Sequence, residues 1–188
     1  MKILTEKMVV SDSKRFIDEM KKGKIFIYPT DTIYGIGCNA LNSKSVEKIR
    51  ELKNREEKPF SVIAPNKKWI IENCETDNSV KKWIKKLPGK YTLILKLKNK
   101  KCICEKTNND SGTLGIRIPQ HWFSKLVEEA NVPFVTTSVN LSGELPANSL
   151  ENINKEIKDK VDYVIDEGRL ENRPSTIVNL INGEIIKR

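Results

Sequence analysis

Short apolar runs alternate with amphipathic stretches along this chain, and this alternation limits the possible folds more than any other feature. Because hairpin signals occur among the interleaved runs, we expect an α/β fold whose twisted mixed sheet is flanked by helices. Residues 1–188 are expected to form a single domain. Helices are predicted over residues 13–23, 43–53, 66–74, 78–87, 121–131 and 150–160, and strands over residues 24–29, 60–64, 91–98, 113–119, 133–138, 162–166, 175–180 and 183–188.

Local turn chemistry adds detail to these predictions. Ser43 or Ser45 is expected to cap the helix over 43–53, which must end before Pro59. The segment 30–41 is interpreted as a loop, and the segment 98–112 as a mobile polar connection. Asn182-Gly183 indicates a type I′ turn between the last two strands.

The chain carries a formal net charge of +9, which favours polyanionic partners such as nucleotide phosphates or nucleic acid. A different origin is also open, since the excess consists mostly of Lys among many Ile and Asn residues, the composition that AT-rich codons produce. Charge alone therefore does not decide between a nucleotide site and a solvated surface.

The cysteines and the single histidine argue against a protein-held metal. Four cysteines include no C-x-x-C pair, and only His121 could add an imidazole ligand. We expect reduced, partly buried thiols. No stretch approaches the roughly 18 apolar residues of a membrane span, and the N-terminus has no small-residue cleavage site. The expected location is the cytosol.

Three polar segments stand out as candidate ligand loops. Residues 30–35 place hydroxyls and Gly35 just after a predicted buried strand, where a ligand can approach the backbone. The segment 52–63, LKNREEKPFSVI, concentrates basic side chains between a helix and a strand, among them Lys53, Arg55 and Lys58. Ser138 and Asn140 lie two residues apart where a strand ends and should project to the same side. Turn and capping roles would select the same residue types, so each segment alone is weak evidence.

The common nucleotide motifs are absent from the sequence. There is no G-x-x-x-x-G-K-[ST], no G-x-G-x-x-G after a strand and no G-x-S-x-G. A nucleotide bound by this chain would be held without the common phosphate loops.

Together the segments resemble a known family. YPTDTIYGIGCNA, then KNR with KP shortly after, then GIRIP, SVNLSG and STIVNL occur in the order found in the YrdC-like threonylcarbamoyl-AMP synthases, in their short single-domain form. The resemblance covers nearly the whole chain and implies the YrdC-like fold, with a positively charged central cavity. The K-x-R and S-x-N pair, here Lys53, Arg55, Ser138 and Asn140, marks the active members.

The resemblance implies a nucleotidyltransferase. L-Threonine, bicarbonate and ATP would give threonylcarbamoyl-adenylate and pyrophosphate, with Mg²⁺ expected on the ATP phosphates and no ligand for it assigned in the protein. A separate transferase would then modify adenosine in tRNA to threonylcarbamoyladenosine, and direct tRNA contact is a possibility.

The resemblance also implies residue roles. The expected catalytic residues are Lys53, Arg55, Ser138 and Asn140. The expected ATP contacts are Arg55, Lys58, Thr113, Ser138, Asn140 and Arg188. The expected threonine contacts are Thr32, Arg117, Thr136 and Thr176. The alternative reading of Arg117 is a strand-edge arginine held in a salt bridge.

Two other functions compete with the synthase. A non-catalytic RNA-binding or ribosome-assembly factor could use the same fold and basic cavity, although this chain keeps the four signature residues. A carbamoyl-transfer module of the kind found in hydrogenase maturation fits less well, because such modules work in longer chains with zinc-finger segments. Pyrophosphate release that depends on both threonine and bicarbonate separates the synthase from both alternatives.

Overall fold

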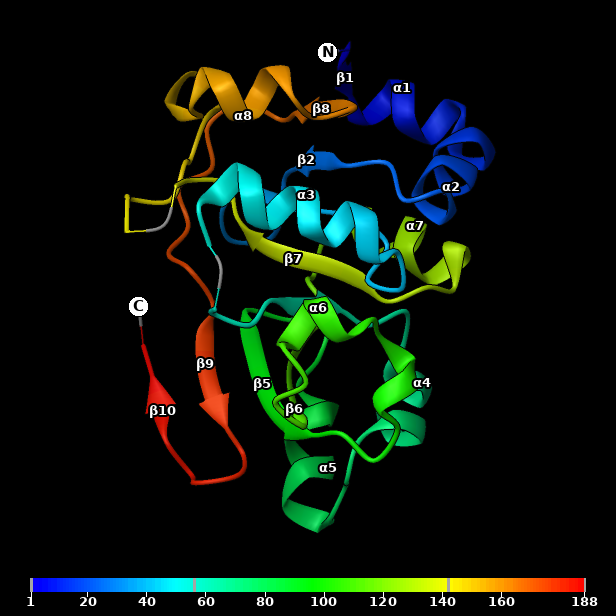
Figure 1. The fold of residues 1–188 in the computed structure, drawn as a ribbon, viewed down its shortest axis with the longest axis vertical. Coiled ribbons are helices and arrows are strands. Elements are labelled where there is room, and N and C mark those ends of the chain that lie inside the picture. Colours follow the sequence, from blue (N-terminus) through cyan, green and yellow to red (C-terminus); the bar gives the residue numbers. More distant parts are fainter. Residues whose placement is uncertain (1, 56, 142, 188) are drawn as a thin grey trace.

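The computed structural model describes residues 2–55, 57–141 and 143–187, and its centre is a mixed sheet of ten strands (Figure 1). The order across the sheet is β1-β8-β2-β3-β7-β4-β6-β5-β9-β10. The strands are β1 (Lys2–Thr5), β2 (Phe26–Tyr28), β3 (Gly35–Gly37), β4 (Ser61–Ile63), β5 (Tyr91–Lys96), β6 (Thr113–Arg117), β7 (Phe134–Ser138), β8 (Tyr163–Asp166), β9 (Thr176–Asn179) and β10 (Ile185–Ile186).

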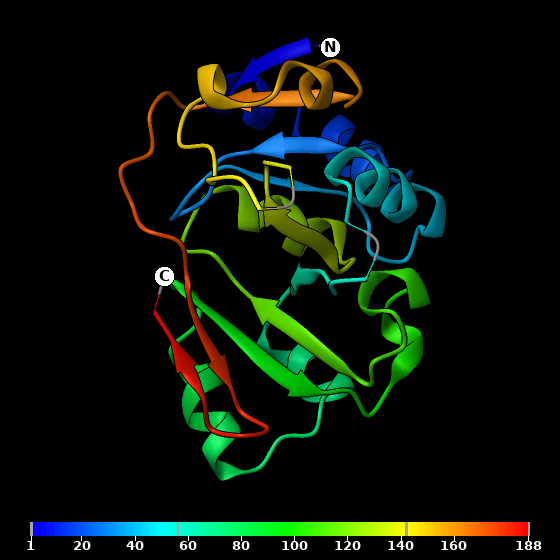
Figure 2. The ribbon, with the colours of Figure 1, turned by 60° about the vertical axis from the view of Figure 1, so that its left-hand side comes forward.

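Parallel and antiparallel pairs both occur in this sheet, which confirms the predicted mixed α/β architecture. The pairs β1–β8, β2–β8, β4–β6 and β5–β9 are parallel. The pairs β2–β3, β3–β7, β4–β7, β5–β6 and β9–β10 are antiparallel. Strand β7 pairs with β3 on one side and β4 on the other, so it joins the two halves of the sheet (Figure 2).

Helices cover both faces of the sheet. They are α1 (Glu6–Ser11), α2 (Ser13–Lys21), α3 (Ser43–Lys53), α4 (Lys67–Asn73), α5 (Asn78–Lys85), α6 (Glu105–Asn108), α7 (Phe123–Ala130) and α8 (Lys155–Asp159), with 3₁₀ helices η1 (Lys100–Cys102) and η2 (Leu150–Asn152). In the part of the chain that the structure describes, no helix combines the length and hydrophobicity needed to cross a bilayer.

Alternating side chains on the strands build two cores, one on each face of the sheet. Ile27 and Val135 belong to the larger core, which the buried residues of α3, α4, α5 and α8 complete. Phe26 and Phe134, their neighbours in sequence, belong to the second core with the buried residues of α1, α2 and α7. This arrangement follows from the period of two in a strand, since adjacent residues point to opposite faces.

Helix α3 begins at Ser43 and ends at Lys53, as predicted, but its cap differs from the prediction. The side chain of Asn42 accepts a hydrogen bond from the backbone N–H of Ser45 at 3.1 Å, so Asn42 is the N-cap and neither predicted serine is. The C-cap is Asn54, whose φ of 48° lies in the left-handed region. Asn tolerates this conformation better than most residues, so the chain can turn toward the segment that holds Arg55.

Four local predictions were wrong. The segment 98–112 is not merely a mobile connection: it contains η1 and α6, with Thr107 fully buried. The loop predicted over 30–41 contains strand β3. The helix predicted over 150–160 is divided into η2 and α8. The hairpin β9–β10 exists, but Asn182 does not have the positive φ that a type I′ turn requires, and the N–H of Gly183 bonds to the carbonyl of Asn179. Helix α1 was not anticipated.

Candidate active site

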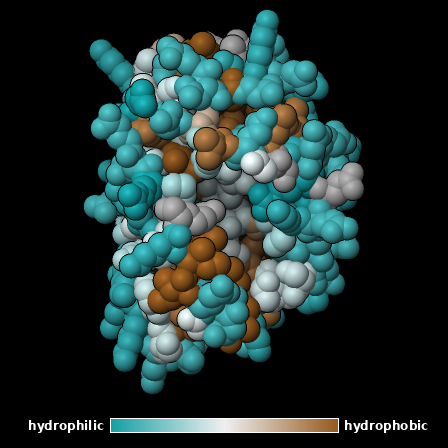
Figure 3. All heavy atoms as spheres, turned by 90° about the vertical axis from the view of Figure 1, so that its left-hand side faces the viewer, coloured by the Kyte–Doolittle hydropathy of each residue, from teal (hydrophilic) through white to brown (hydrophobic). Residues whose placement is uncertain are grey.

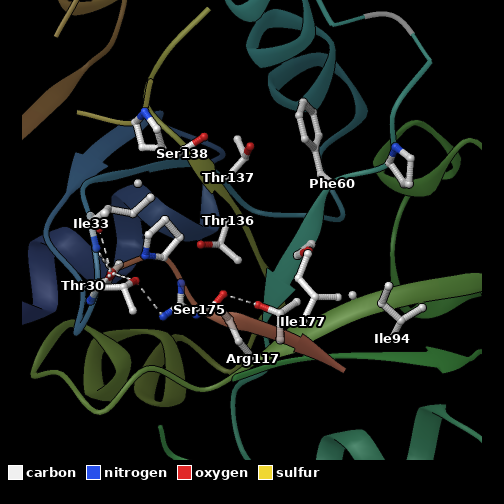
Figure 4. A pocket seen from close by; sticks show the side chains of 18 of the residues that line it. Thr30, Ile33, Phe60, Ile94, Arg117, Thr136, Thr137, Ser138, Ser175 and Ile177 are labelled. Atoms are coloured by element: carbon white, nitrogen blue, oxygen red, sulfur yellow. Dashed lines mark hydrogen bonds between the residues drawn. The ribbon is translucent and has the colours of Figure 1, made fainter. Parts of the chain in front are cut away.

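A cavity of about 300 Å³ opens beside the central strand β7. Its walls come from the loop 30–35, from β4, β5, β6 and β7, and from the start of β9, segments that are far apart in sequence. Figure 4 shows Thr136, Thr137 and Ser138 of β7 around this space, with Phe60, Ile94 and Ile177 as apolar walls. The face in Figure 3 is hollowed near its centre, above a hydrophobic patch. The cavity therefore offers hydroxyls on one wall and apolar surface on another, as small-molecule sites do.

Arg117 on β6 is a buried cation that lines this cavity, with 7% of its surface exposed. Its Nη2 donates to Asp31 Oδ1 at 2.5 Å and to Thr32 Oγ1 at 3.3 Å. Its Nε has no hydrogen-bond partner among the described residues. Burial lowers the pKa of the guanidinium, and the charge of Asp31 opposes that effect. A buried, partly unsatisfied arginine beside a cavity is well placed to bind an anionic ligand.

Arg117 thus forms the salt bridge of the alternative reading, but it does so beside the cavity and not at the edge of the sheet. Strand β6 lies between β4 and β5 and is not an edge. Asp31 in turn accepts from the backbone N–H of Gln120 at 3.0 Å. The carboxylate of Asp31 therefore orients the guanidinium of Arg117, which still lines the cavity.

Arg55 is the second arginine of the cavity lining. Its Nη1 donates to Thr137 Oγ1 at 3.3 Å, and its Nη2 donates to the carbonyl of Pro59 at 2.7 Å. Its guanidinium carbon lies 5.2 Å from the centre of the Phe60 ring. These contacts fix the guanidinium in the lining of the cavity that Arg117 also lines.

Arg50 supports this turn and was missed by the sequence analysis. Its side chain is buried against the Phe60 ring and donates to the carbonyl oxygens of Arg55 and Lys58, at 3.0 and 3.2 Å. The only signal in the sequence was its position on the same helix as Lys53. A helical arginine usually faces solvent, so residue type alone did not reveal it.

Lys53 is buried and is not part of the cavity lining. Its side chain is 1% exposed, and its Nζ donates to the carbonyl oxygens of Ser138 at 2.5 Å and of Asn140 at 2.6 Å. Burial lowers its pKa to about 7, with a smaller contribution from the charge of Arg55 and an opposing one from Glu144. The ammonium group therefore holds the backbone of the loop that follows β7.

Ser138 and Asn140 project to the same side, as expected, and contact each other. The hydroxyl of Ser138 donates to Asn140 Oδ1. The amide of Asn140 donates to the carbonyl oxygens of Leu141 at 2.9 Å and of Glu144 at 2.7 Å. Ser138 lines the cavity, whereas Asn140 is outside the lining and holds the backbone at Leu141 and Glu144.

The other expected ligand residues divide by position. Thr32, Thr113 and Thr136 line the cavity. Lys58 is exposed and lies outside the lining, and the prediction for Arg188 falls outside the described residues.

Thr176 is also outside the cavity lining, whereas Ser175 and Ile177 are in it. The hydroxyl of Ser175 contacts that of Thr92 at 2.8 Å. Alternation along an extended strand places residues 175 and 177 on one face and 176 on the other. The period of two would have identified Ser175 if the cavity face of this strand had been known.

The G-x-G of residues 35–37 is explained by close packing. A Cβ on Gly37 would lie 1.8 Å from the carbonyl oxygen of Val135, and one on Gly35 would lie 3.1 Å from the Tyr28 ring. Gly37 thus lets β3 lie close to β7, and Gly35 leaves room for the Tyr28 ring of β2, and both keep the loop 30–35 beside the cavity.

No metal-binding group of three or more His, Cys, Asp or Glu side chains occurs among residues 2–55, 57–141 and 143–187. The four cysteines are free thiols, three of them buried, and burial raises the pKa of Cys38 well above its usual value. His121 contacts a carboxylate oxygen of Glu167 at 2.8 Å, away from the cavity.

The mixed sheet and its arginine-bearing cavity define an α/β protein with a candidate small-molecule site. The chain belongs to the Sua5/YciO/YrdC family, whose model, described as "Telomere recombination", matches residues 18–188.

Named relatives cover most of this chain. It is 40% identical over 183 residues to a Methanocaldococcus jannaschii protein named "Putative threonylcarbamoyl-AMP synthase", covering 93% of this chain and 85% of the relative. It is 30% identical over 175 residues to the threonylcarbamoyl-AMP synthase of Idiomarina loihiensis, covering 88% of this chain and 92% of the relative.

Solved structures show the same fold. Sua5 of P. abyssi, complexed with L-threonine, superposes with a TM-score of 0.85 at 22% identity, covering 98% of this chain and 56% of Sua5. E. coli YciO superposes with a TM-score of 0.83 at 23% identity, covering 98% of this chain and 93% of YciO. The chain thus spans about half the length of Sua5 and nearly all of the length of YciO.

Proposed function

We propose that this protein is a threonylcarbamoyl-AMP synthase, a nucleotidyltransferase that converts L-threonine, bicarbonate and ATP into threonylcarbamoyl-adenylate and pyrophosphate. The observation that carries the proposal is the convergence of Arg55, Arg117 and Ser138 with threonine hydroxyls on one cavity. The synthase names of the two relatives at 30% and 40% identity support the same reaction.

The reaction brings two anions together, threonine carbamate and ATP, and the cavity lining supplies two arginines near which they can meet. The amine of threonine and bicarbonate form a carbamate with loss of water. A carbamate oxygen then bonds to the α-phosphorus of ATP while the bond from that phosphorus to the bridging oxygen breaks, and pyrophosphate leaves with the electron pair. No covalent bond to the protein is required. Fixed cationic donors in a sheltered space reduce the repulsion between the reactants and stabilise the developing charge.

The threonine end of the reaction is assigned to Arg117, Thr32 and Thr136. Arg117 offers a fork for the amino-acid carboxylate, and Asp31 holds that fork in position. Thr32 lies next to the guanidinium, and Thr136 lies on the neighbouring β7 wall. The solved Sua5 complex contains L-threonine, which agrees with an amino-acid site in this fold.

The ATP end is assigned to Arg55, Ser138 and Thr113. Arg55 would stabilise the charge on the transferring phosphate, with the Ser138 hydroxyl beside it. Lys58 and Arg188 stay as proposed ATP contacts, and Thr176 as a proposed threonine contact, without support from the cavity lining.

Lys53 and Asn140 are assigned as positioning residues. Both act on the backbone of the loop that follows β7, and neither lines the cavity. Lys53 ties the carbonyl oxygens of residues 138 and 140 together, so it fixes the place of the Ser138 hydroxyl. All four signature residues thus have a role in the mechanism. Arg55 and Ser138 contact the substrates, whereas Lys53 and Asn140 hold the loop after β7 in position.

Mg²⁺ is proposed to arrive with ATP. The cavity lining contains two arginines and no carboxylate, a donor set that does not fit a protein-held cation. Magnesium on the β- and γ-phosphates would neutralise charge on the leaving group. The same lining supports a positively charged cavity.

The wider setting follows from the product. Threonylcarbamoyl-adenylate is a mixed anhydride that must be consumed by a separate transferase acting on tRNA adenosine. We place this work in the cytoplasm and assign it to residues 1–188 as one domain, with tRNA contact left to the transferase step.

Pyrophosphate release tests the proposal. Purified protein with Mg²⁺ and ATP should release pyrophosphate only when threonine and bicarbonate are both present. Pyrophosphate release without threonine or without bicarbonate would contradict the proposed synthase activity. No release with both present would contradict it as well. Undiminished RNA binding by an inactive protein would instead favour the non-catalytic RNA factor.

A further inference from the structure

The positive charge of this chain is concentrated in one segment. Residues 66–101 contain eleven lysines, three acidic residues and no arginine, so they carry eight of the nine net positive charges. AT-rich codons would spread the lysine excess along the whole chain, whereas the rest of the chain is almost balanced. A local excess of one sign is the electrostatic footprint of a surface that binds a polyanion.

Helix α5 carries the densest part of this charge. Val80 and Ile84 turn one side of the helix into the larger core. The opposite side presents four exposed lysines, here called the lysine face: Lys81, Lys82, Lys85 and Lys86. No acidic residue lies on this helix, and lysines four positions apart on a helix repel each other. The lysine face therefore has a cost in helix stability that a mixed, solvated surface would avoid.

Three ammonium groups of the lysine face are available to a partner. Lys81, Lys82 and Lys85 form no ion pair with any residue in the part of the chain that the structure describes. Lys86 differs, because its Nζ lies 3.7 Å from the centre of the Trp83 ring. The first three thus carry charge without a structural task, and the fourth also packs on the helix.

Lysines of neighbouring elements extend the lysine face. Lys67 Nζ, at the start of α4, donates to the carbonyl of Lys85 at 3.4 Å. Lys98 Nζ, just after β5, donates to the carbonyl of Ile71 on α4 at 2.8 Å. Figure 1 shows α4 and α5 in the half of the molecule farthest from β1 and α1. Lysines from three segments therefore follow one another along this end of the protein.

The sheet separates the lysine face from the cavity. Thr92 and Ile94 of β5 line the cavity, whereas Leu93 and Leu95 belong to the larger core against which α5 packs. Adjacent residues of a strand point to opposite faces, so the lysine face and the cavity lie on opposite sides of the sheet. The lysine face is thus distinct from the site proposed for threonine and ATP.

We propose that the lysine face docks the phosphate backbone of a structured RNA. Lysine supplies mobile point charges that match phosphates, and residues 66–101 contain no arginine fork of the kind that reads base edges. The contact is therefore with the backbone and independent of sequence. This docking goes beyond the proposed function, which needs no RNA contact; only the choice of RNA over DNA rests on it, because its product is consumed on tRNA.

The same surface is less suited to the other large anionic partners. A helix that lies on a membrane places an apolar face in the lipid, whereas α5 buries its apolar side in the core of the protein. Protein interfaces are depleted of lysine. A rigid, phosphate-rich RNA accepts a purely lysine surface without either requirement.

Fluorescence anisotropy of a labelled RNA hairpin, titrated with the full chain at several salt concentrations and without ATP or threonine, tests this surface. The triple variant Lys81→Gln/Lys82→Gln/Lys85→Gln should bind at least about tenfold more weakly at about 0.1 M salt. The logarithm of its affinity should also fall less steeply with the logarithm of salt concentration. The slope should decrease by about one for each lysine removed, because each phosphate contact releases counterions.

Two controls separate the lysine face from net charge and from the cavity. Lys7→Gln/Lys14→Gln/Lys125→Gln removes the same charge from exposed positions on α1, α2 and α7, and it should leave affinity and slope unchanged. Arg55→Ala removes a cation from the cavity and should also leave RNA binding unchanged. Pyrophosphate release and the unfolding midpoint of the triple variant should match those of the unaltered protein, because its three lysines are exposed and outside the cavity lining.

The outcomes decide between the partners. Equal RNA affinity and slope in the triple variant and the unaltered protein overturns the proposal, as does an equal loss in the control triple variant. A loss in Arg55→Ala as large as in the triple variant places RNA in the cavity and also overturns it. Tighter lysine-dependent binding to a DNA duplex of the same length, to vesicles of phosphatidylcholine and phosphatidylserine in equal parts, or to polyglutamate overturns RNA as the partner. Lysine-dependent RNA binding supports the docking surface even if threonine-dependent release fails, a failure that would fall on the synthase alone.

Discussion

Arg55 is the side chain on which the proposed chemistry depends most directly. Arg55→Ala should lower the rate of threonine-dependent pyrophosphate release by about a hundredfold or more, because it removes a fixed cationic donor from the phosphate end of the cavity. Arg55→Lys should stay impaired, since a single ammonium group cannot reproduce the fork that reaches Thr137 and Pro59.

The control for Arg55 is a change of the same type elsewhere. Arg15→Ala on α2 should leave the rate unchanged. Circular dichroism and the unfolding midpoint of the Arg55 variants would show that the fold persists. Turnover of Arg55→Ala at the rate of the unaltered protein would remove Arg55 from the mechanism.

Lys53 should make the stability of the fold depend on pH. Burial lowers its pKa from 10.5 to about 7 in the folded protein, so between these values the unfolded chain binds more protons than the folded one. The free energy of unfolding therefore rises with pH from about 7 to 10, with a slope from this group of at most about 1.4 kcal/mol per pH unit. Below pH 7 both states are protonated and the slope disappears.

Urea unfolding of the unaltered protein and of Lys53→Met across pH 6 to 10 measures this slope. The variant should lose the part of the pH dependence that Lys53 contributes. It should also turn over more slowly, because the carbonyl oxygens of Ser138 and Asn140 lose their shared donor. Identical pH slopes in the two proteins would show that Lys53 titrates normally.

The motifs predicted several residues that line the cavity, but not the positions of all of them. Arg55, Arg117 and Ser138 were expected at the site from their motifs, and they line the cavity. Lys53 and Thr176 were expected in the same way but are not part of the lining. A motif fixes which residues are present, whereas burial and strand phase fix where they point, and both depend on contacts distant in sequence.

At the level of elements, helices with strong periodicity were predictable and short elements were not. Helix α3 has the predicted bounds because Val46 and Ile49 repeat on its buried face. Strand β3 has three residues and two are glycine, so it carries no hydrophobic pattern. The segment 98–112 looked polar, yet tertiary packing buries Cys102 and Thr107 there.

The N-cap of α3 provides a test at this scale. Asn42→Ala should lower the free energy of unfolding by about 1 kcal/mol, because the N–H of Ser45 loses its side-chain acceptor. Ser43→Ala, at an exposed position of the first turn that was itself a predicted cap, should change it little. Urea unfolding compares the two, and a larger effect of Ser43→Ala would restore the serine cap.

The site belongs to the whole molecule rather than to any one element. Its walls come from both halves of the sheet, and β7 joins those halves through β3 and β4. Periodicity in the sequence predicted the strands other than β1 and β3 but not their order, so it did not predict which loops meet. The resemblance to a known family provided that information before the structure did.

Cooperative unfolding of the whole sheet is the prediction at this scale. Trp69 and Trp83 pack against the larger core, whereas Trp122 packs against the second core on the opposite face. A variant with Trp69→Phe and Trp83→Phe reports on Trp122 alone, and Trp122→Phe reports on the other two. If residues 1–188 form one domain, fluorescence and far-ultraviolet circular dichroism should give the same urea midpoint within each variant. Separate fluorescence and dichroism transitions within either variant would mean that the two cores unfold independently, and the cavity would then open before the chain unfolds.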